Sequence, residues 1–169
     1  NYAILAPSGH NTQPWLFRIK KDFVEVYFDQ TAALPVVDPD NRELMMSVGA
    51  ALFNLRLALR YFGYSADTAI LPDPQKPDLA ARVSLGRPYT PTDDEKEMFH
   101  AIPGRRTNRS AFEPRPVAET LLEALKMAAN QEGAWLYVVE REDVRNAVAD
   151  LVAEGDKIQW QNKQFRREL

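Results

Sequence analysis

The sequence predicts an α+β domain, in which strands and helices follow one another without strict alternation. Strand-like runs at 15–20 and 23–29 precede a long helical pattern at 42–62, and further strand-like and helical runs follow it. Hydrophobic residues make up 45% and charged residues 27% of the 169 residues, as in an ordinary globular protein. This length is that of about one compact domain.

The composition excludes several classes of site and partner. The net charge is −3 and the pI is near 5.5, which argues against a nucleic-acid-binding surface. The chain has no cysteine, and its histidines, His10 and His100, lie far apart, so we expect no disulfide, no thiolate chemistry and no metal site. The most apolar stretch, 48–62, is interrupted by Arg56 and Arg60, so we expect no membrane span and a cytoplasmic location.

The first two strands are expected at 15–20 and 23–29, where aromatic and β-branched residues are frequent. Lys21 and Asp22 between them have the right length for a two-residue hairpin turn, although no glycine follows Asp22. Residues 30–41 contain two prolines and are expected to form a loop.

The strongest helical pattern covers about residues 42–62, where apolar residues recur at helical spacing. These residues are Leu44, Val48, Ala51, Leu55, Ala58 and Phe62. Asp38 or Asp40 can cap the start of the helix, and Gly63 can end it. The segment 48–51 is unusually small, which suits either tight helix packing or the close approach of a flat ligand. We place this helix in the core.

The rest of the chain predicts a series of further elements. Strands are expected at 65–71 and 81–85, helices at about 92–103 and 121–129, a strand at 134–140 and a helix at about 144–158. Thr92 and Glu95 have the spacing of a capping box at the start of the first of these helices. Residues 86–92 are the best candidate for a boundary between two parts of the chain.

Residues 6–15 read Ala-Pro-Ser-Gly-His-Asn-Thr-Gln-Pro-Trp and directly precede the first strand. The second proline fixes its own backbone and biases the preceding residue away from the helical region, so we expect an ordered loop and not a helix. Ser8, Asn11 and Gln13 offer hydroxyl and amide groups, and Gly9 lets a ligand approach the backbone closely. The segment is either a ligand-binding loop or an ordinary surface connection.

A second polar segment, residues 103–109, reads Pro-Gly-Arg-Arg-Thr-Asn-Arg and lies between two predicted helices. Arg105 and Arg109 carry permanent planar charges that suit bidentate binding of a phosphate or a carboxylate, and Thr107 adds a hydroxyl. The segment is either an anion clamp, most simply for a phosphate ester, or a solvated surface loop. Nucleic acid is a poor fit, because no basic patch with interleaved aromatic residues accompanies it.

Together the two segments resemble the nitroreductase superfamily of flavin-dependent proteins. Residues 7–15 are similar to that family's Pro-Ser-x-x-Asn-x-Gln-Pro-Trp segment, which lies against the flavin. Residues 105–109 are similar to its Arg-Arg-Ser-x-Arg segment, which holds the FMN phosphate, with Thr107 in place of serine. Residues 49–59 with Gly63-Tyr64 resemble its long core helix. The resemblance implies a nitroreductase-like fold, in which helices flank an antiparallel or mixed sheet around that central helix.

The order of the two segments is reversed relative to an ordinary nitroreductase, in which the arginine segment comes first. The reversed order resembles the fused, Acg-type branch, in which two nitroreductase-like halves share one chain, and this sequence is most similar to the N-terminal half. Residues 1–90 would then be a first half lacking its start, and 91–169 the beginning of a truncated second half. Because the family's flavin lies at a dimer interface, we expect a homodimer or an intramolecular pseudo-dimer with a missing C-terminal half.

The resemblance implies FMN as the cofactor, NAD(P)H as the electron donor and a nitroaromatic compound or a quinone as the acceptor. FMN would carry the chemistry, so we expect no catalytic side chain. The residues implied to bind FMN are Pro7, Ser8, Gly9, His10, Asn11, Gln13, Arg105, Arg106, Thr107 and Arg109. Among them, Arg105 and Arg109 would neutralise the phosphate.

Two alternatives to this oxidoreductase stay open. The fused branch implies flavin binding more firmly than turnover, so the chain is alternatively a non-catalytic FMN-binding or flavin-storage protein with a covered flavin. A weaker alternative is a binding module whose arginine segment holds a carboxylate of a partner protein. Oxidation of NAD(P)H in the presence of an acceptor distinguishes the oxidoreductase from the flavin-storage protein. The binding module is indicated if Arg105→Ala with Arg109→Ala abolishes partner binding while flavin binding persists.

Overall fold

The computed structural model describes all residues from 1 to 169. The chain divides into two compact units, one formed by residues 1–107 with 167–169 and the other by residues 108–166. The division into nitroreductase-like halves at 1–90 and 91–169 concerns ancestry and stays a prediction. None of the helices is long and apolar enough to cross a lipid bilayer.

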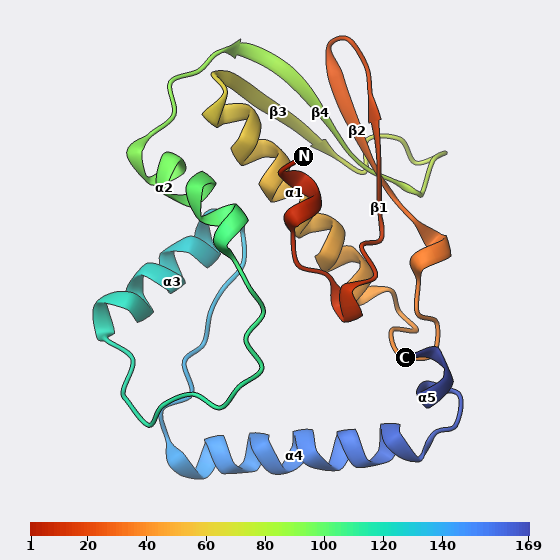
Figure 1. Cartoon of the computed structure of the whole chain (residues 1–169), viewed down its shortest axis with the longest axis vertical. Helices are drawn as coiled ribbons and strands as arrows, with labels where there is room; N and C mark the ends of the chain where they lie inside the picture. The colour runs from red at the N-terminus through yellow and green to blue at the C-terminus, as the bar shows by residue number, and fades with distance from the viewer. The chain divides into compact units, whose positions relative to one another are not determined.

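The first unit is built on a four-stranded antiparallel sheet in the order β1-β2-β4-β3. Its strands are β1 (Trp15–Ile19), β2 (Phe23–Phe28), β3 (Tyr64–Ile70) and β4 (Leu79–Pro88). Its helices are α1 (Arg42–Tyr61) and α2 (Asp93–Ala101), with 3-10 turns at Ala3–Leu5, Gly9–Asn11, Gln30–Ala32 and Ile102–Gly104. Figure 1 shows α1 lying across one face of this sheet. The predicted α+β class is confirmed, and β4 extends beyond its predicted bounds at both ends.

The core of the first unit lies between α1 and the sheet. Because successive residues of a strand point to opposite faces, every second residue of the central strands meets the helix. Val26 of β2 and Ala81 and Val83 of β4 are fully buried and cluster with Val48 and Ala51 of α1. Each fully buried valine contributes about 1.5–3 kcal/mol relative to an exposed one. The predicted core position of the long helix is therefore confirmed.

Asp38 caps the start of α1 from outside the helix. Its carboxylate accepts hydrogen bonds from the Arg42 amide at 2.8 Å and from the Leu44 amide at 2.9 Å. Asn41, the residue directly before the helix, has a left-handed backbone with φ of 54° and makes no side-chain cap. Of the two predicted caps, Asp38 is thus the one that binds the free amides of the first turn.

The small segment of α1 serves two faces of the helix. Val48 and Ala51 belong to the core, whereas Gly49 is exposed. A Cβ atom on Gly49 would have no neighbour within 4 Å. Tight packing in the core therefore explains the small or compact side chains of Val48 and Ala51. No such packing explains Gly49, whose side-chain position is open.

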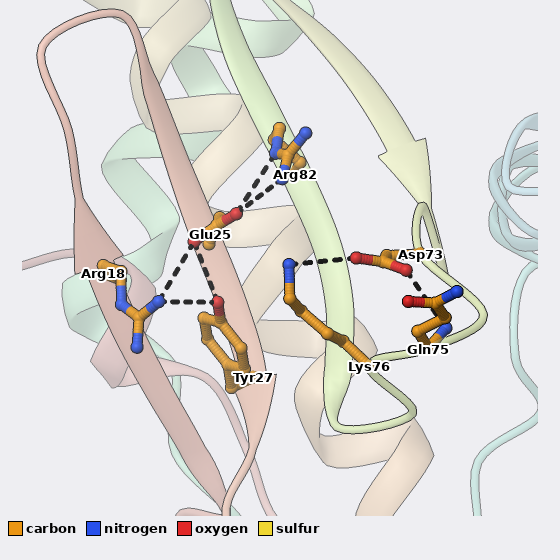
Figure 2. Close-up of polar contacts among 7 residues, drawn as sticks. All are labelled: Arg18, Glu25, Tyr27, Asp73, Gln75, Lys76 and Arg82. Carbon is orange, nitrogen blue, oxygen red and sulfur yellow. Dashed lines mark hydrogen bonds and ion pairs between the residues drawn. The ribbon is translucent and has the colours of Figure 1, made fainter.

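The other face of the sheet carries a row of charged residues, shown in Figure 2. Glu25 of β2 pairs in register with Arg18 of β1 and Arg82 of β4. Its carboxylate accepts hydrogen bonds from Arg82 at 2.7 Å and from the Tyr27 hydroxyl at 2.9 Å, and Arg18 lies 3.8 Å away. Only 6% of Glu25 is exposed. The hydrogen bonds from Arg82 and Tyr27 hold the pKa of the Glu25 carboxyl below its usual value.

We expect Glu25→Gln to lower the free energy of unfolding at neutral pH by about 1–3 kcal/mol, because Arg82 and Tyr27 lose a charged acceptor. Since folding lowers the pKa of Glu25, its stabilising effect is present above the ordinary value of 4.5 and is lost as the pH falls through the folded-state pKa. Urea denaturation across this pH range measures the effect. The stability difference between parent and variant should shrink in acid, and a difference that stays constant would contradict the assignment.

The second unit contains α3 (Glu119–Gln131) and α4 (Glu142–Gln161), and α5 (Phe165–Glu168) follows near the end of the chain. Both long helices were predicted, and Gly133 follows α3 with a φ of 75°. The predicted strand at 134–140 is wrong, since these residues are in neither a helix nor a strand. A strand needs a neighbouring strand for its backbone hydrogen bonds, and the four strands of this chain pair only with one another.

Candidate functional site

The loop before β1 is ordered by its own hydrogen bonds. The Asn11 amide donates to the Ser8 carbonyl and the Thr12 amide to the Gly9 carbonyl, each at 3.1 Å, which makes Gly9–Asn11 a single 3-10 turn. The Ser8 hydroxyl accepts a hydrogen bond from the Gln13 amide at 3.0 Å. The predicted ordered loop is therefore present, and these local hydrogen bonds close one 3-10 turn within it.

Three residues of this loop that are not glycine have a left-handed backbone. The angle φ is 48° at His10, 59° at Asn11 and 51° at Gln13. This region costs roughly 1–2 kcal/mol per residue for side chains other than glycine, and asparagine tolerates it best. Gln13 avoids the right-handed helical region before Pro14, as predicted, but it is left-handed instead of extended. Strained backbone of this kind persists only where surrounding contacts impose it, and it clusters at functional sites.

The loop is attached to α1 through Gly9. The Gly9 amide donates to the Ser47 hydroxyl at 3.1 Å, and that hydroxyl donates to the Glu43 carbonyl at 2.6 Å. A Cβ atom on Gly9 would collide with the Glu43 carboxylate. The close approach that a glycine permits is thus used here, first of all, for packing against α1.

A groove of about 280 Å³ lies between this loop and α1. Its lining residues are Pro7, Ser8, Gly9, Glu43, Met46, Ser47 and Ala50, and we name it the Ser8 groove. His10, Asn11 and Gln13 are exposed. The side-chain amides of Asn11 and Gln13 have no hydrogen-bond partner within the chain, so both stay available to a ligand.

The arginine segment begins where the 3-10 turn after α2 ends. Arg105 points its guanidinium toward the Leu5 carbonyl at 3.4 Å and lies 3.5 Å from the Thr107 hydroxyl. Arg106 instead donates to the carbonyls of Pro103 at 2.8 Å and of Arg105 at 2.7 Å. The two neighbouring arginines therefore differ in role: Arg105 contacts the N-terminal segment, and Arg106 binds its own turn.

A second groove, of about 210 Å³, contains Arg105. Its lining residues are Phe53, Asn54, Met98, Ala101, Ile102 and Arg105, and we name it the Arg105 groove. Phe53 in this groove and Met46 in the Ser8 groove are two helical turns apart on α1, or about 10 Å. The two grooves therefore follow one another along the same face of α1.

Glu95 holds α2, and with it the arginine turn, in place. Its carboxylate accepts hydrogen bonds from the Thr92 amide at 2.9 Å, the Tyr89 hydroxyl at 3.1 Å and Arg60 of α1 at 3.1 Å. The Thr92 hydroxyl in turn accepts from the Glu95 amide at 3.2 Å, which confirms the predicted capping box. Burial raises the pKa of Glu95, but the Thr92, Tyr89 and Arg60 contacts outweigh it, so the pKa lies below its usual value.

The structure brings together part of the predicted site. Arg105 reaches the segment that leads into Pro7 and Ser8, and both motifs lie against α1. Arg109 belongs to the other unit, so its part in the site stays a prediction. Trp15 is buried in the core and lines neither groove.

Sequence reasoning missed two residues of α1 that shape the Ser8 groove. Ser47 is buried and holds the Gly9 amide, and Glu43 places a carboxylate beside Gly9. The one sequence signal for Ser47 is a hydroxyl on the apolar stripe of a helix. Glu43 has no such signal, since an acidic residue in the first turn is common in any helix.

Comparison with known proteins finds relatives that match nearly the whole chain. "Putative NAD(P)H nitroreductase Rv3131" of Mycobacterium tuberculosis is 32% identical over 167 residues, which are 99% of this chain and 47% of that protein. "Putative NAD(P)H nitroreductase acg" of the same organism is 25% identical over 99% of this chain and 50% of its own length. "Probable NAD(P)H nitroreductase PigM" of a Serratia species is 28% identical over 99% of this chain and 48% of its own length. The chain is a relative of these proteins.

The predicted resemblance to Acg-type nitroreductases is thereby confirmed. The chain spans about half the length of the curated nitroreductase relatives it matches. This half-length match fits a chain that corresponds to about half of such a nitroreductase. No family model matches the chain.

Proposed function

We propose that this chain binds FMN and forms part of a nitroreductase-like protein that passes electrons from NAD(P)H to nitroaromatic compounds or quinones. The observation that supports the proposal most directly is the contact of Arg105 with the residues that lead into the first motif: its guanidinium lies 3.4 Å from the carbonyl of Leu5, two residues before Pro7. The names of the nitroreductase relatives, which match 99% of the chain, support the same class of reaction.

The chemistry of the two grooves fits the two ends of FMN. The Arg105 groove combines apolar side chains with one guanidinium, which suits a phosphate group. The Ser8 groove combines Met46 and Ala50 with hydroxyl groups, which suits a flat ring that also forms hydrogen bonds. A ligand with one anionic end and one ring end therefore matches both grooves along a single helix.

In this proposal each side chain binds or orients the cofactor. Arg105 and Arg109 bind the phosphate, and Thr107 donates a hydrogen bond to it. Arg106 stabilises the turn through its hydrogen bonds to the carbonyls of Pro103 and Arg105. Ser8, Asn11 and Gln13 hold the ribityl chain or the ring edge, with Pro7, Gly9 and His10 shaping the loop that carries them. FMN, when bound, supplies the hydride transfer, and no side chain of this chain has to act as a general acid.

We also propose that a second nitroreductase-like half completes the site. Residues 1–90 and 91–169 would belong to two such halves of a nitroreductase-like fold, in a homodimer or an intramolecular pseudo-dimer in the cytoplasm. The half-length match to these relatives supports a homodimer or a pseudo-dimer, whereas the boundary at residue 90 rests on the resemblance alone. Analytical ultracentrifugation of the FMN-loaded chain distinguishes a dimer from a monomer.

Uptake of FMN tests the proposed function. The purified chain, mixed with FMN and then desalted, should retain flavin absorbance in a stoichiometric amount. A chain that is folded by circular dichroism but remains colourless would contradict the proposal. For a loaded chain, rapid oxidation of NAD(P)H with a quinone or a nitroaromatic acceptor supports an oxidoreductase, whereas FMN retention without turnover favours the flavin-storage alternative.

A further inference from the structure

Glu168, the last residue of α5, belongs to the first unit and binds a loop that lies far away in the sequence. Its carboxylate accepts hydrogen bonds from the Val36 amide at 2.9 Å and from the Val37 amide at 2.7 Å. Neither amide donates to any other group of the chain. Half-buried backbone amides need an acceptor, and a carboxylate is a charged one, so these hydrogen bonds hold the loop before α1 firmly.

The two amides lie inside a turn that ends at the cap of α1. The Asp38 amide donates to the Leu34 carbonyl at 2.7 Å, so residues 34–38 close on themselves. The Asp38 carboxylate then accepts hydrogen bonds from two amides at the start of α1. Glu168 therefore holds the turn that carries the cap of α1.

The same turn also borders the loop before β1. Leu34 and Asp38 line a small cavity together with Gly9 and Thr12 of that loop. Gly9 in turn lines the Ser8 groove. Glu168 lines neither the Ser8 groove nor the Arg105 groove, so its effect on ligand binding has to pass through the turn.

We infer that Glu168 is a positioning residue for the FMN ring: it fixes residues 34–38, and these keep Gly9 and the loop before β1 in the geometry that binds the ring. The inference rests on the proposed function, which gives the Ser8 groove to the ring, and it adds a residue that neither motif contains. Coupling between two sites typically changes a binding constant about 5–150-fold. We expect the lower part of this range, roughly 5–30-fold, because the loop also keeps its own hydrogen bonds.

The affinity for two flavins tests this inference. FMN and riboflavin are each titrated into the purified chain, and binding is measured from the quenching of flavin fluorescence. Glu168→Ala should weaken both ligands by the same factor, roughly 5–30-fold, because the change disturbs the ring and not the phosphate. Glu168→Gln keeps one acceptor oxygen and should recover part of the affinity. A loss confined to FMN would place the effect at the phosphate and overturn the inference.

Glu25→Gln provides the control for a general loss of stability. Glu25 belongs to the same unit, lies on the other face of the sheet from α1 and lines neither groove. Its change removes one negative charge, as Glu168→Ala does, and also destabilises the unit. At a temperature where each variant is folded by circular dichroism, Glu25→Gln should leave the affinity for both flavins unchanged. An equal loss in Glu25→Gln, or an unchanged affinity in Glu168→Ala, would contradict a positioning role.

Amide hydrogen exchange measured by NMR gives a readout that needs no flavin. In Glu168→Ala the amides of Val36 and Val37 should exchange roughly 10–100-fold faster than in the parent, because they lose a charged acceptor. The amides of Gly9 and Gln13, which donate to serine hydroxyls, should also exchange faster, whereas those of β4 should not change. If Glu168→Ala does not fold, the same comparison is made with Glu168→Gln.

The failure of this inference is distinguishable from the failure of the proposed function. If the chain takes up no FMN, the proposed function fails. Faster exchange at Gly9 in the Glu168 variants then still supports Glu168 as the residue that positions the loop, and unchanged exchange overturns it. If FMN binds equally well to the parent and to Glu168→Ala, the role of Glu168 is wrong and the proposed function stands.

Discussion

Replacing Glu95 with alanine should lower the free energy of unfolding of the first unit by about 2–4 kcal/mol. The Glu95 carboxylate accepts hydrogen bonds from Thr92, Tyr89 and Arg60, and only 8% of the residue is exposed. Its removal leaves these donors without their acceptor and removes one of the two hydrogen bonds of the capping box of α2. The side chain of Arg60 is 35% exposed and can regain water, which keeps the expected loss below that of a fully buried ion pair.

The stability of the first unit can be measured separately from that of the second. Trp15 lies in the first unit, whereas Trp135 and Trp160 lie in the second, so a Trp135→Phe, Trp160→Phe background reports unfolding through Trp15 alone. Urea denaturation followed by fluorescence then gives the free energy of unfolding. Glu97→Gln changes an exposed carboxylate on the same helix and should alter stability by less than about 0.5 kcal/mol. Equal effects of the Glu95 and Glu97 changes would contradict the assigned role.

The pH dependence of the Glu95 effect has a defined sign. Because folding lowers the pKa of Glu95, its stabilising contribution is complete above the ordinary value of 4.5 and is lost as the pH falls through the folded-state pKa. The stability difference between the parent and Glu95→Gln should therefore be largest at neutral pH and shrink in acid.

Arg105→Ala should weaken FMN binding by roughly 10–100-fold, since hydrogen bonds to a charged group contribute about 1.5–3 kcal/mol each. Arg105 is the charged residue of the Arg105 groove, and its guanidinium is bound only to the Leu5 carbonyl and the Thr107 hydroxyl at long distances of 3.4 and 3.5 Å. Arg106→Ala should have a smaller effect on FMN affinity, because that guanidinium is already bound to the carbonyls of its own turn.

Riboflavin separates the loss of a phosphate contact from a general disturbance of the site. Because riboflavin lacks the phosphate, Arg105→Ala should leave its affinity nearly unchanged while that of FMN falls. Arg105→Lys should recover part of the FMN affinity, since lysine keeps the charge but not the planar pair of donors. Arg87→Ala removes an exposed arginine of the same unit and controls for net charge. A fall in riboflavin affinity equal to that for FMN would show that Arg105 does not bind phosphate.

Several elements follow from short-range patterns, and these were predicted well. The apolar spacing of 42–62 gave α1, and the Thr92–Glu95 spacing gave the capping box of α2. The strand at 134–140 failed for a physical reason: β-propensity describes how side chains suit a pleated surface, but a strand exists only where another strand receives its hydrogen bonds. The 3-10 turn at Gly9–Asn11 was missed because proline and glycine signals do not specify which local carbonyls the amides will find.

The sequence by itself determined the class of the fold, the long core helix, the two polar segments and the resemblance to nitroreductases, since each depends on neighbouring residues or on a contiguous motif. Only the tertiary structure decided that Arg105 rather than Arg106 contacts Leu5, directly before the first segment, through a hydrogen bond between residues 100 positions apart. It also decided that Ser47 and Glu43 of α1 shape the Ser8 groove. Such contacts depend on how a helix packs against a loop distant in sequence, which no local pattern encodes.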